Sequence, residues 1–185
     1  AGTVRKLVAR NPLPSDWRDD SQAGLTVIHD RAESLERFMG AYARLARLPP
    51  PTRQQADLGA LVHRVASLHG SQIAIESGPD LRLSLDPDQI EQVLINLMRN
   101  AVEAAGETGG VCVRWRRDGG NVFIEVEDDG PGISRTDNLF EPFFTTKPHG
   151  TGLGLALSQR IVTAHQGTID LRAATPCIRS CSCMR

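Results

Sequence analysis

The segment NVFIEVEDDGPGI, residues 121–133, is predicted to form a β-strand that runs into two carboxylates and a glycine turn. Because side chains alternate across a strand, the two valines and Ile124 share one face with Asp128. The DGGN turn at residues 118–121 joins this strand to a second one, Val111 to Arg116, as a hairpin. Asp128 therefore ends an otherwise apolar face.

Hydrophobic periodicity and turn residues predict that the rest of the chain mixes helices and strands. The pair Asp86-Pro87 opens one helix in the favoured way, with Asp86 as the N-cap and proline in the first turn. The triple proline at residues 49–51 ends a long amphipathic helix and marks a domain boundary. The expected helices are Asp19–Leu48, Leu58–Leu68, Asp86–Ala105 and Gly154–Ala164, and the further strands are Gln72–Glu76, Leu81–Leu85 and Thr168–Arg172.

Length and composition fit one ordinary domain with a short attached element. The 185 residues include 21 basic and 22 acidic side chains, so a net charge of -1 gives no field that would recruit nucleic acid. No apolar run reaches the roughly 20 residues that span a bilayer. The four cysteines do not form a disulfide framework. We therefore expect a soluble, cytoplasmic piece with no nucleic-acid partner.

Three polar residues, Asn96, Asn100 and Glu103, lie about one turn apart along the border of the apolar stripe of helix 86–105. An amide oxygen suits Mg²⁺, an ion that takes few protein oxygens when phosphates supply the others. Taken alone, this pattern is equally compatible with a solvated helix face.

Asp128 needs a hydrogen-bond donor, because burying an unpaired charge is costly, and the exocyclic amine of adenine is a suitable one. Gly130 and Gly132 allow the backbone to approach a flat ligand closely. Taken alone, an Asp-Gly turn after a strand would explain these residues equally well.

A second glycine-rich segment, residues 150–154, comes just before a helix, where N–H groups and the helix dipole favour phosphate. Between the two glycine segments, residues 139–148 carry three phenylalanines and Lys147. This pattern is typical of a lid whose lysine meets a terminal phosphate, although a permanently packed loop remains an alternative.

Taken together, the motifs NLMRNA (96–101), DDGPGI (128–133), FEPFFTTK (140–147) and GTGLGL (150–155) resemble the N, first glycine, F and second glycine boxes of sensor histidine kinases. The resemblance covers about Ala56 to Ala173. It implies an α+β fold, a two-layer α/β sandwich with a mixed sheet covered by helices on one face, and it implies ATP and Mg²⁺. By matching positions it implies Mg²⁺ at Asn100 and adenine at Asp128, with Asn96 and Lys147 as catalytic residues. The other nucleotide-binding residues that it implies are Gly130, Gly132, Ile133, Thr146, Gly150, Thr151, Gly152, Leu153 and Gly154, together with Asn96 and Lys147 themselves.

One position separates kinase from hydrolase in this comparison. The ATP-hydrolysing branches of the superfamily hold a water-activating Glu one turn before the Mg²⁺-binding Asn, whereas this chain holds Asn96. An amide cannot accept the proton, so transfer of the γ-phosphoryl group to an outside nucleophile is the predicted reaction.

The N-terminal part, residues 1–51, resembles part of the dimerisation and histidine-phosphotransfer hairpin of nitrogen-regulation-type kinases. It lacks the acceptor histidine of that hairpin, and His29 lies on the second helix without the following proline. The resemblance implies an acceptor histidine upstream, a response regulator as the next partner, a possible homodimer through the N-terminal helices and a membrane-anchored parent sensor. Residues 52–173 are then the ATP-binding domain, and 174–185 an atypical tail.

The chain departs from the family pattern at Glu103 and Ala104, where many relatives carry a lysine and an aromatic residue. Phosphate contacts then fall to Lys147, with Arg99 and His149 as weaker candidates. Two alternatives to a kinase stay open at this point. One is an ATPase of the same superfamily that drives a conformational change, and the other is a nucleotide-binding module without catalysis.

Overall fold

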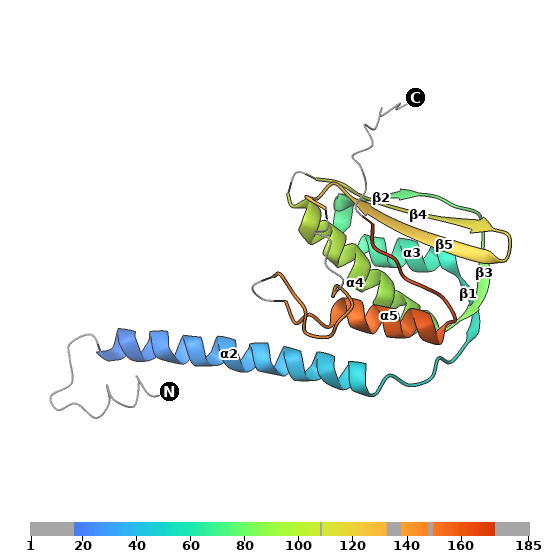
Figure 1. Cartoon of the computed structure of the whole chain (residues 1–185). Coiled ribbons are helices and arrows are strands. Elements are labelled where there is room, and N and C mark those ends of the chain that lie inside the picture. The colour runs from blue at the N-terminus through green and yellow to red at the C-terminus, as the bar shows by residue number, and fades with distance from the viewer. Residues whose placement is uncertain (1–16, 108, 133–137, 148–149, 173–185) are drawn as a thin grey trace.

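The computed structural model describes residues 17–107, 109–132, 138–147 and 150–172. A long helix, α2 (Trp17–Ala46), extends away from a compact α/β body (Figure 1). The body contains α3 (Leu58–Ser67), the short 3-10 turn η1 (Gly70–Gln72), α4 (Pro87–Ala105) and α5 (Gly154–Ala164). Its strands are β1 (Gln54–Asp57), β2 (Ile73–Glu76), β3 (Arg82–Leu85), β4 (Val111–Asp118) and β5 (Asn121–Asp128).

The main sheet is mixed, with the order β2-β4-β5. Strands β2 and β4 run parallel, while β4 and β5 form the predicted antiparallel hairpin, in which Asp118 faces Asn121. Gly119 in its turn has φ +58, a conformation that a residue without Cβ adopts at no steric cost. A separate two-stranded sheet pairs β1 with β3 antiparallel.

One face of the main sheet is covered by α3 and α4, which confirms the predicted two-layer α+β sandwich (Figure 1). Trp115 of β4 lies at the centre of this core, and its indole N–H donates to the Pro79 carbonyl over 2.9 Å. Gly78 must be glycine here, because a Cβ would lie 2.1 Å from the Trp115 carbonyl oxygen. The core residues with the least exposure are Leu58, Val62, Val65, Leu94, Met98 and Val113.

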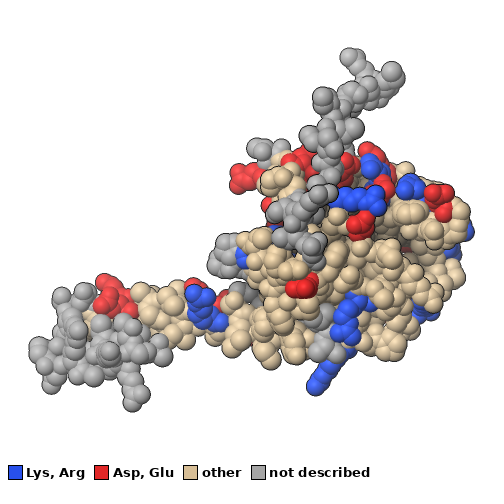
Figure 2. Space-filling view, viewed as in Figure 1, with Lys and Arg blue, Asp and Glu red and all other residues tan. Residues whose placement is uncertain are grey.

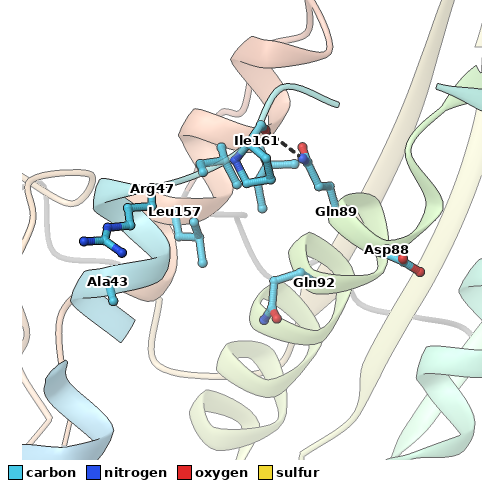
Figure 3. A pocket seen from close by; sticks show the side chains of 9 residues that line it. Ala43, Arg47, Asp88, Gln89, Gln92, Leu157 and Ile161 are labelled. Carbon is cyan, nitrogen blue, oxygen red and sulfur yellow. Dashed lines mark hydrogen bonds between the residues drawn. The ribbon is translucent and has the colours of Figure 1, made fainter. Parts of the chain in front are cut away.

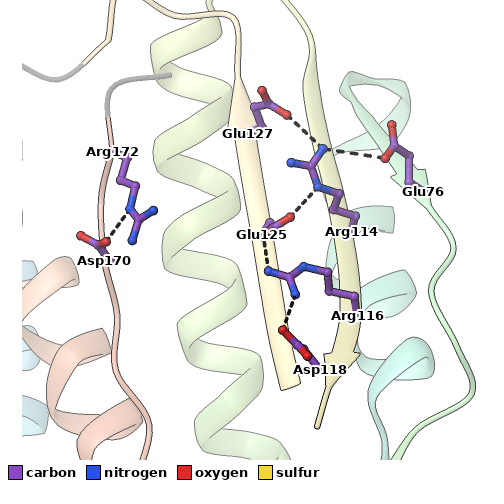
Figure 4. Close-up of polar contacts among 8 residues, drawn as sticks. All are labelled: Glu76, Arg114, Arg116, Asp118, Glu125, Glu127, Asp170 and Arg172. Atoms are coloured by element: carbon purple, nitrogen blue, oxygen red, sulfur yellow. Dashed lines mark hydrogen bonds and ion pairs between the residues drawn. The ribbon is translucent and has the colours of Figure 1, made fainter. Parts of the chain in front are cut away.

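The other face of the sheet carries charged residues in an ion-pair network (Figure 4). Arg114 Nε donates to Glu125 over 2.5 Å, and its Nη1 lies 3.3 Å from Glu127. The hydrogen bond with Glu125 raises the pKa of Arg114 and, in return, lowers the pKa of Glu125. On the visible face of the molecule acidic and basic side chains are interspersed over the sheet (Figure 2), so this face is adapted to solvent.

Asp86 fixes the start of α4 and ties the linker from α2 to it. Its carboxylate accepts the N–H of Gln89 at 3.1 Å and that of Thr52 at 2.8 Å, and its own N–H donates to His165 Nε2 at 3.1 Å. Gln89 in turn donates to the Pro49 carbonyl. Burial opposes the charge of Asp86, but the backbone N–H groups outweigh it and hold the pKa below its ordinary value of 3.8.

Helix α2 is 30 residues long, and its limits agree with the prediction to within two residues at each end. Leu25, Leu35 and Met39 are 59%, 61% and 52% exposed. Uncharged side chains occupy much of its visible face (Figure 2). Among the described residues no helix is long and apolar enough to cross a membrane.

Two predictions about strands need correction. Residues 168–172 were expected to form a strand, but within the described residues they form none, and β5 pairs only with β4. A strand needs a partner with free N–H and C=O groups in register, which the propensity of Ile169 and Leu171 cannot supply. Strand β1 was missed because its four residues, QQAD, carry no apolar alternation, and pairing with β3 alone defines it.

The predicted N-cap at Asp86 leads to a stability test. Replacement of Asp86 by Ala should lower the free energy of unfolding at pH 7 by about 1–2 kcal/mol, because two N–H groups lose their acceptor. Since the pKa of Asp86 is depressed in the folded state, its stabilisation is present above the unfolded pKa of about 3.9 and is lost as the pH falls through the folded value. Urea unfolding of the wild type and Asp86→Ala between pH 7 and pH 3 measures this difference in stability. Asp86→Asn should keep most of the stabilisation by the cap. A difference between wild type and Asp86→Ala that stays constant with pH would contradict the role of the charge.

Candidate functional site

The predicted site residues lie on four parts of the fold. Helix α4 carries the two asparagines in its second half, and β5 ends at Asp128. The phenylalanine-rich segment ends at Lys147, and the second glycine segment leads into α5. Of the predicted residues, Ile133 lies outside the described residues, as does His149, a weaker candidate for a phosphate contact.

Asn96 is only 4% exposed, and its amide joins α4 to α5. The Nδ2 group donates to the Gly154 carbonyl and to Ser158 Oγ, each over 3.3 Å, and Gln92 lies 3.5 Å from Oδ1. The side chain is therefore engaged at the first turn of α5 and holds the glycine segment against α4.

Asn100, one turn further on, makes a different contact. Its Oδ1 accepts from Lys147 Nζ over 3.2 Å, although the two residues are 47 positions apart. The same ammonium group forms an ion pair with Glu103. The amide oxygen of Asn100 thus already faces a cation, and the donor set around it fits a positively charged ligand.

The strand end at Asp128 is built for close approach. Asp128 Oδ1 accepts the Gly130 N–H over 2.9 Å, and a Cβ on Gly130 would lie 2.6 Å from that oxygen and 2.8 Å from the Ala104 carbonyl oxygen. Gly132 has φ +80, in the region that favours glycine. Asp129 turns away from Asp128 and accepts from the Gly110 N–H, so the two neighbouring carboxylates are separated.

The second glycine segment packs against the lid. Gly152 has φ +64, and a Cβ there would lie 2.5 Å from the Phe143 carbonyl carbon, while the Phe143 N–H donates to the Gly152 carbonyl over 3.0 Å. Leu153 is buried and gives α5 no side-chain cap. The first N–H groups of this 11-residue helix are therefore free of a capping side chain, as a phosphate site requires.

The lid also contacts α2 through an aromatic stack. The Phe143 ring lies 5.5 Å from Phe38 and 6.2 Å from Tyr42, centre to centre, and Phe143 has φ +75. This conformation is strained for a residue with a Cβ, so the surrounding contacts have to maintain it. The lid therefore connects the long helix to the site on α4.

A cavity of about 440 Å³ lies at a different place, between the end of α2, the linker, α4 and α5 (Figure 3). Gln89, Gln92 and Leu157 line it, in the first turns of α4 and on α5. Gln92 is eight residues from Asn100, which is about 12 Å along a helix. Asn100 and Lys147 do not line the cavity, and nothing in the sequence indicated it.

Glu103 makes contacts that the sequence did not reveal. The sequence marked it as a departure from the family pattern, whereas the structure pairs it with Lys147 and sets it 3.9 Å from Arg99. Lys147 is predicted to face a terminal phosphate, and in the nucleotide-free chain it contacts two side chains of α4. A negative charge three residues after an amide on the same helix face was the only signal available.

Comparison with known proteins agrees with this geometry. Residues 85–180 match the family described as histidine kinase-, DNA gyrase B- and HSP90-like ATPase. The structure is similar to the catalytic domain of histidine kinase ThkA, with a TM-score of 0.54 and 35% identity, over 60% of this chain and 79% of that one. The chain belongs to the catalytic ATPase domains of histidine kinases. ATP binding follows from this membership.

Longer relatives extend the likeness of this histidine kinase domain. AtoS of Escherichia coli, a signal transduction histidine-protein kinase, is 36% identical over 83% of the chain, and the sensor histidine kinase ZraS of Klebsiella oxytoca is 37% identical over 94%. The chain spans only 27% and 39% of their lengths. ThkA in complex with the response regulator TrrA matches 90% of the chain with a TM-score of 0.66 and 25% identity.

The two asparagines should respond differently to mutation. Asn96→Ala should lower the free energy of unfolding by about 1–3 kcal/mol, because it removes the hydrogen bond from the middle of α4 to the Gly154 carbonyl. Asn100→Ala should change it by less than about 0.5 kcal/mol, since the residue is half-exposed, yet should weaken the binding of Mg-ATP. Urea unfolding and calorimetry with Mg-ATP measure both effects. Equal losses of stability in the two variants would contradict this assignment.

Proposed function

We propose that this chain transfers the γ-phosphoryl group of Mg-ATP to a histidine on a helix outside it. The observation that supports the proposal is the contact between Lys147 and Asn100, since it brings an ammonium group next to an amide oxygen of the kind that suits Mg²⁺. Positive charge gathered there would stabilise the transferring phosphoryl group. Asn100 would hold Mg²⁺, which would supply positive charge to the phosphates when bound.

The nature of Asn96 supports transfer to a histidine rather than to water. An amide cannot act as a general base, and its N–H group is already used by the Gly154 carbonyl. In this proposal Asn96 has a catalytic role only by holding α5 and its glycine segment in position. The attacking nucleophile is an imidazole nitrogen, which needs no base because its lone pair is available when the ring is neutral.

The nucleotide would lie between β5, the lid and the start of α5. Asp128 would accept a hydrogen bond from the exocyclic amine of adenine. Gly130, Gly132 and Ile133 would lie around the base. Lys147 would move from α4 to the terminal phosphate. The N–H groups at the start of α5 would hold the phosphates, and the residues of this part are Thr146, Gly150, Thr151, Gly152, Leu153 and Gly154.

The phosphorylated histidine would then pass its phosphoryl group to a response regulator. The complex of ThkA with TrrA supports this, because the likeness covers 90% of the present chain. Residues 1–51 would belong to the dimerisation and phosphotransfer hairpin, and 52–173 to the catalytic domain. We further propose that this domain works in the cytoplasm, where ATP is available, as part of a membrane-anchored sensor.

A transfer assay tests the proposal. The chain is mixed with labelled ATP and with the histidine-bearing upstream helix of the longer protein, and we expect label on that histidine. Asp128→Asn should lower transfer at least tenfold, because the charged acceptor for the exocyclic amine of adenine becomes a neutral amide. Asp118→Asn is the matched control, since Asp118 is an exposed carboxylate in the hairpin turn. Release of free phosphate at the same rate with and without the histidine-bearing helix would support an ATPase instead. If the chain bound no nucleotide, both the kinase and the ATPase activity would be excluded.

We also propose that α2 forms a homodimer through its exposed apolar face. Leu25, Leu35 and Met39 are more than half exposed, and burying such side chains on association is favourable. Light scattering at micromolar concentration should give twice the chain mass, and Leu25→Glu with Leu35→Glu should return it to the monomer value. A monomer at all concentrations would exclude dimerisation by this helix alone.

A further inference from the structure

Lys147 lies at a position where a nucleotide-bound metal ion would be expected. Its ammonium group is 3.2 Å from Asn100 Oδ1, the oxygen proposed above as the Mg²⁺ ligand, and it is paired with Glu103. Two oxygens on α4, three residues apart, thus converge on one cation. Because like charges repel, an ammonium group at this oxygen opposes the binding of Mg²⁺ at Asn100.

We infer that Glu103 is a positioning residue that holds Lys147 on Asn100 while the site is empty. The inference rests on the proposed function, because it concerns the entry of Mg-ATP into the same site. Glu103 does not touch the nucleotide and acts through Lys147 alone. Binding of Mg-ATP separates the ion pair, and Lys147 then exchanges the carboxylate for a terminal phosphate.

The surroundings of Glu103 allow this exchange. Arg99 lies one turn before it at 3.9 Å, so Glu103 keeps a positive neighbour after Lys147 leaves. Lys147 is 43% exposed and Glu103 46% exposed, so the pair opens directly into solvent without moving the core. An ion pair of this exposure shifts an equilibrium by a factor of about two to five, which is enough to set nucleotide affinity without blocking the site.

Calorimetry with Mg-AMPPNP, an ATP analogue with a non-hydrolysable bridge, tests this inference. Glu103→Gln should lower the Kd about two- to fivefold, because nothing then holds Lys147 on Asn100. Glu103→Asp keeps the charge but is shorter by one methylene, so its Kd should lie between those of the wild type and Glu103→Gln. Glu107→Gln is the control for charge alone, since it makes the same change on an exposed residue just beyond α4, and it should leave the Kd within about 1.5-fold.

Acylation of Lys147 by an N-hydroxysuccinimide ester, followed by mass spectrometry, reports on the lysine directly. In the nucleotide-free chain Glu103→Gln should raise the rate about two- to fivefold, whereas Glu107→Gln should leave it unchanged.

The outcomes separate this inference from the proposed function. A higher Kd in Glu103→Gln would make Glu103 a metal ligand and would overturn the inference, as would an unchanged Kd. A Kd for Glu103→Asp equal to that of the wild type would show that only net charge matters, which also overturns it. Failure of the wild-type chain to bind nucleotide would remove the proposed function and the inference together.

Discussion

Helix α4 has to fill two hydrophobic cores at once, and this constraint determines where the polar residues of the site can lie. One side of the helix packs with α3 and the sheet through Leu94 and Met98, and another packs with α5 through Val93. Ile90 contacts both cores. The polar positions that remain form a narrow strip along the helix. Residues on this strip are buried where α5 covers the helix and are accessible beyond the first turn of α5.

Asn96 and Asn100 differ in environment for this reason. Asn96 lies where the first turn of α5 crosses α4, so its amide is buried and bonded to Gly154 and Ser158. Asn100 lies one turn beyond and faces the lid. The same residue type one helical turn apart therefore joins two helices in one case and contacts Lys147 in the other. The sequence predicted that both amides share a border of the helix, but only tertiary packing separates their environments.

Much of the fold was predictable because its signals are local. The cap at Asp86, the glycine turn of the hairpin and the triple proline each act within a few residues, and the structure confirms all three. Predictions failed where a distant partner decides the outcome. Strand β1 exists only because β3 lies beside it, and residues 168–172 form no ladder despite their alternation. The contact of Lys147 with Asn100 joins residues 47 positions apart and follows from the path of the lid.

The burial of Asn96 bears on the choice between phosphotransfer and hydrolysis. A glutamate at this position would direct carboxylate oxygens at the Gly154 carbonyl, where the asparagine now donates an N–H group. Two acceptors facing each other in a buried place are unfavourable, so the start of α5 would have to shift to accept a base. The glycine segment that leads into α5 would move with it, because its last residue carries that carbonyl. The amide at position 96 is therefore coupled to the position of the glycine segment before α5. Replacing Asn96 by Glu alone would not produce a water-activating site.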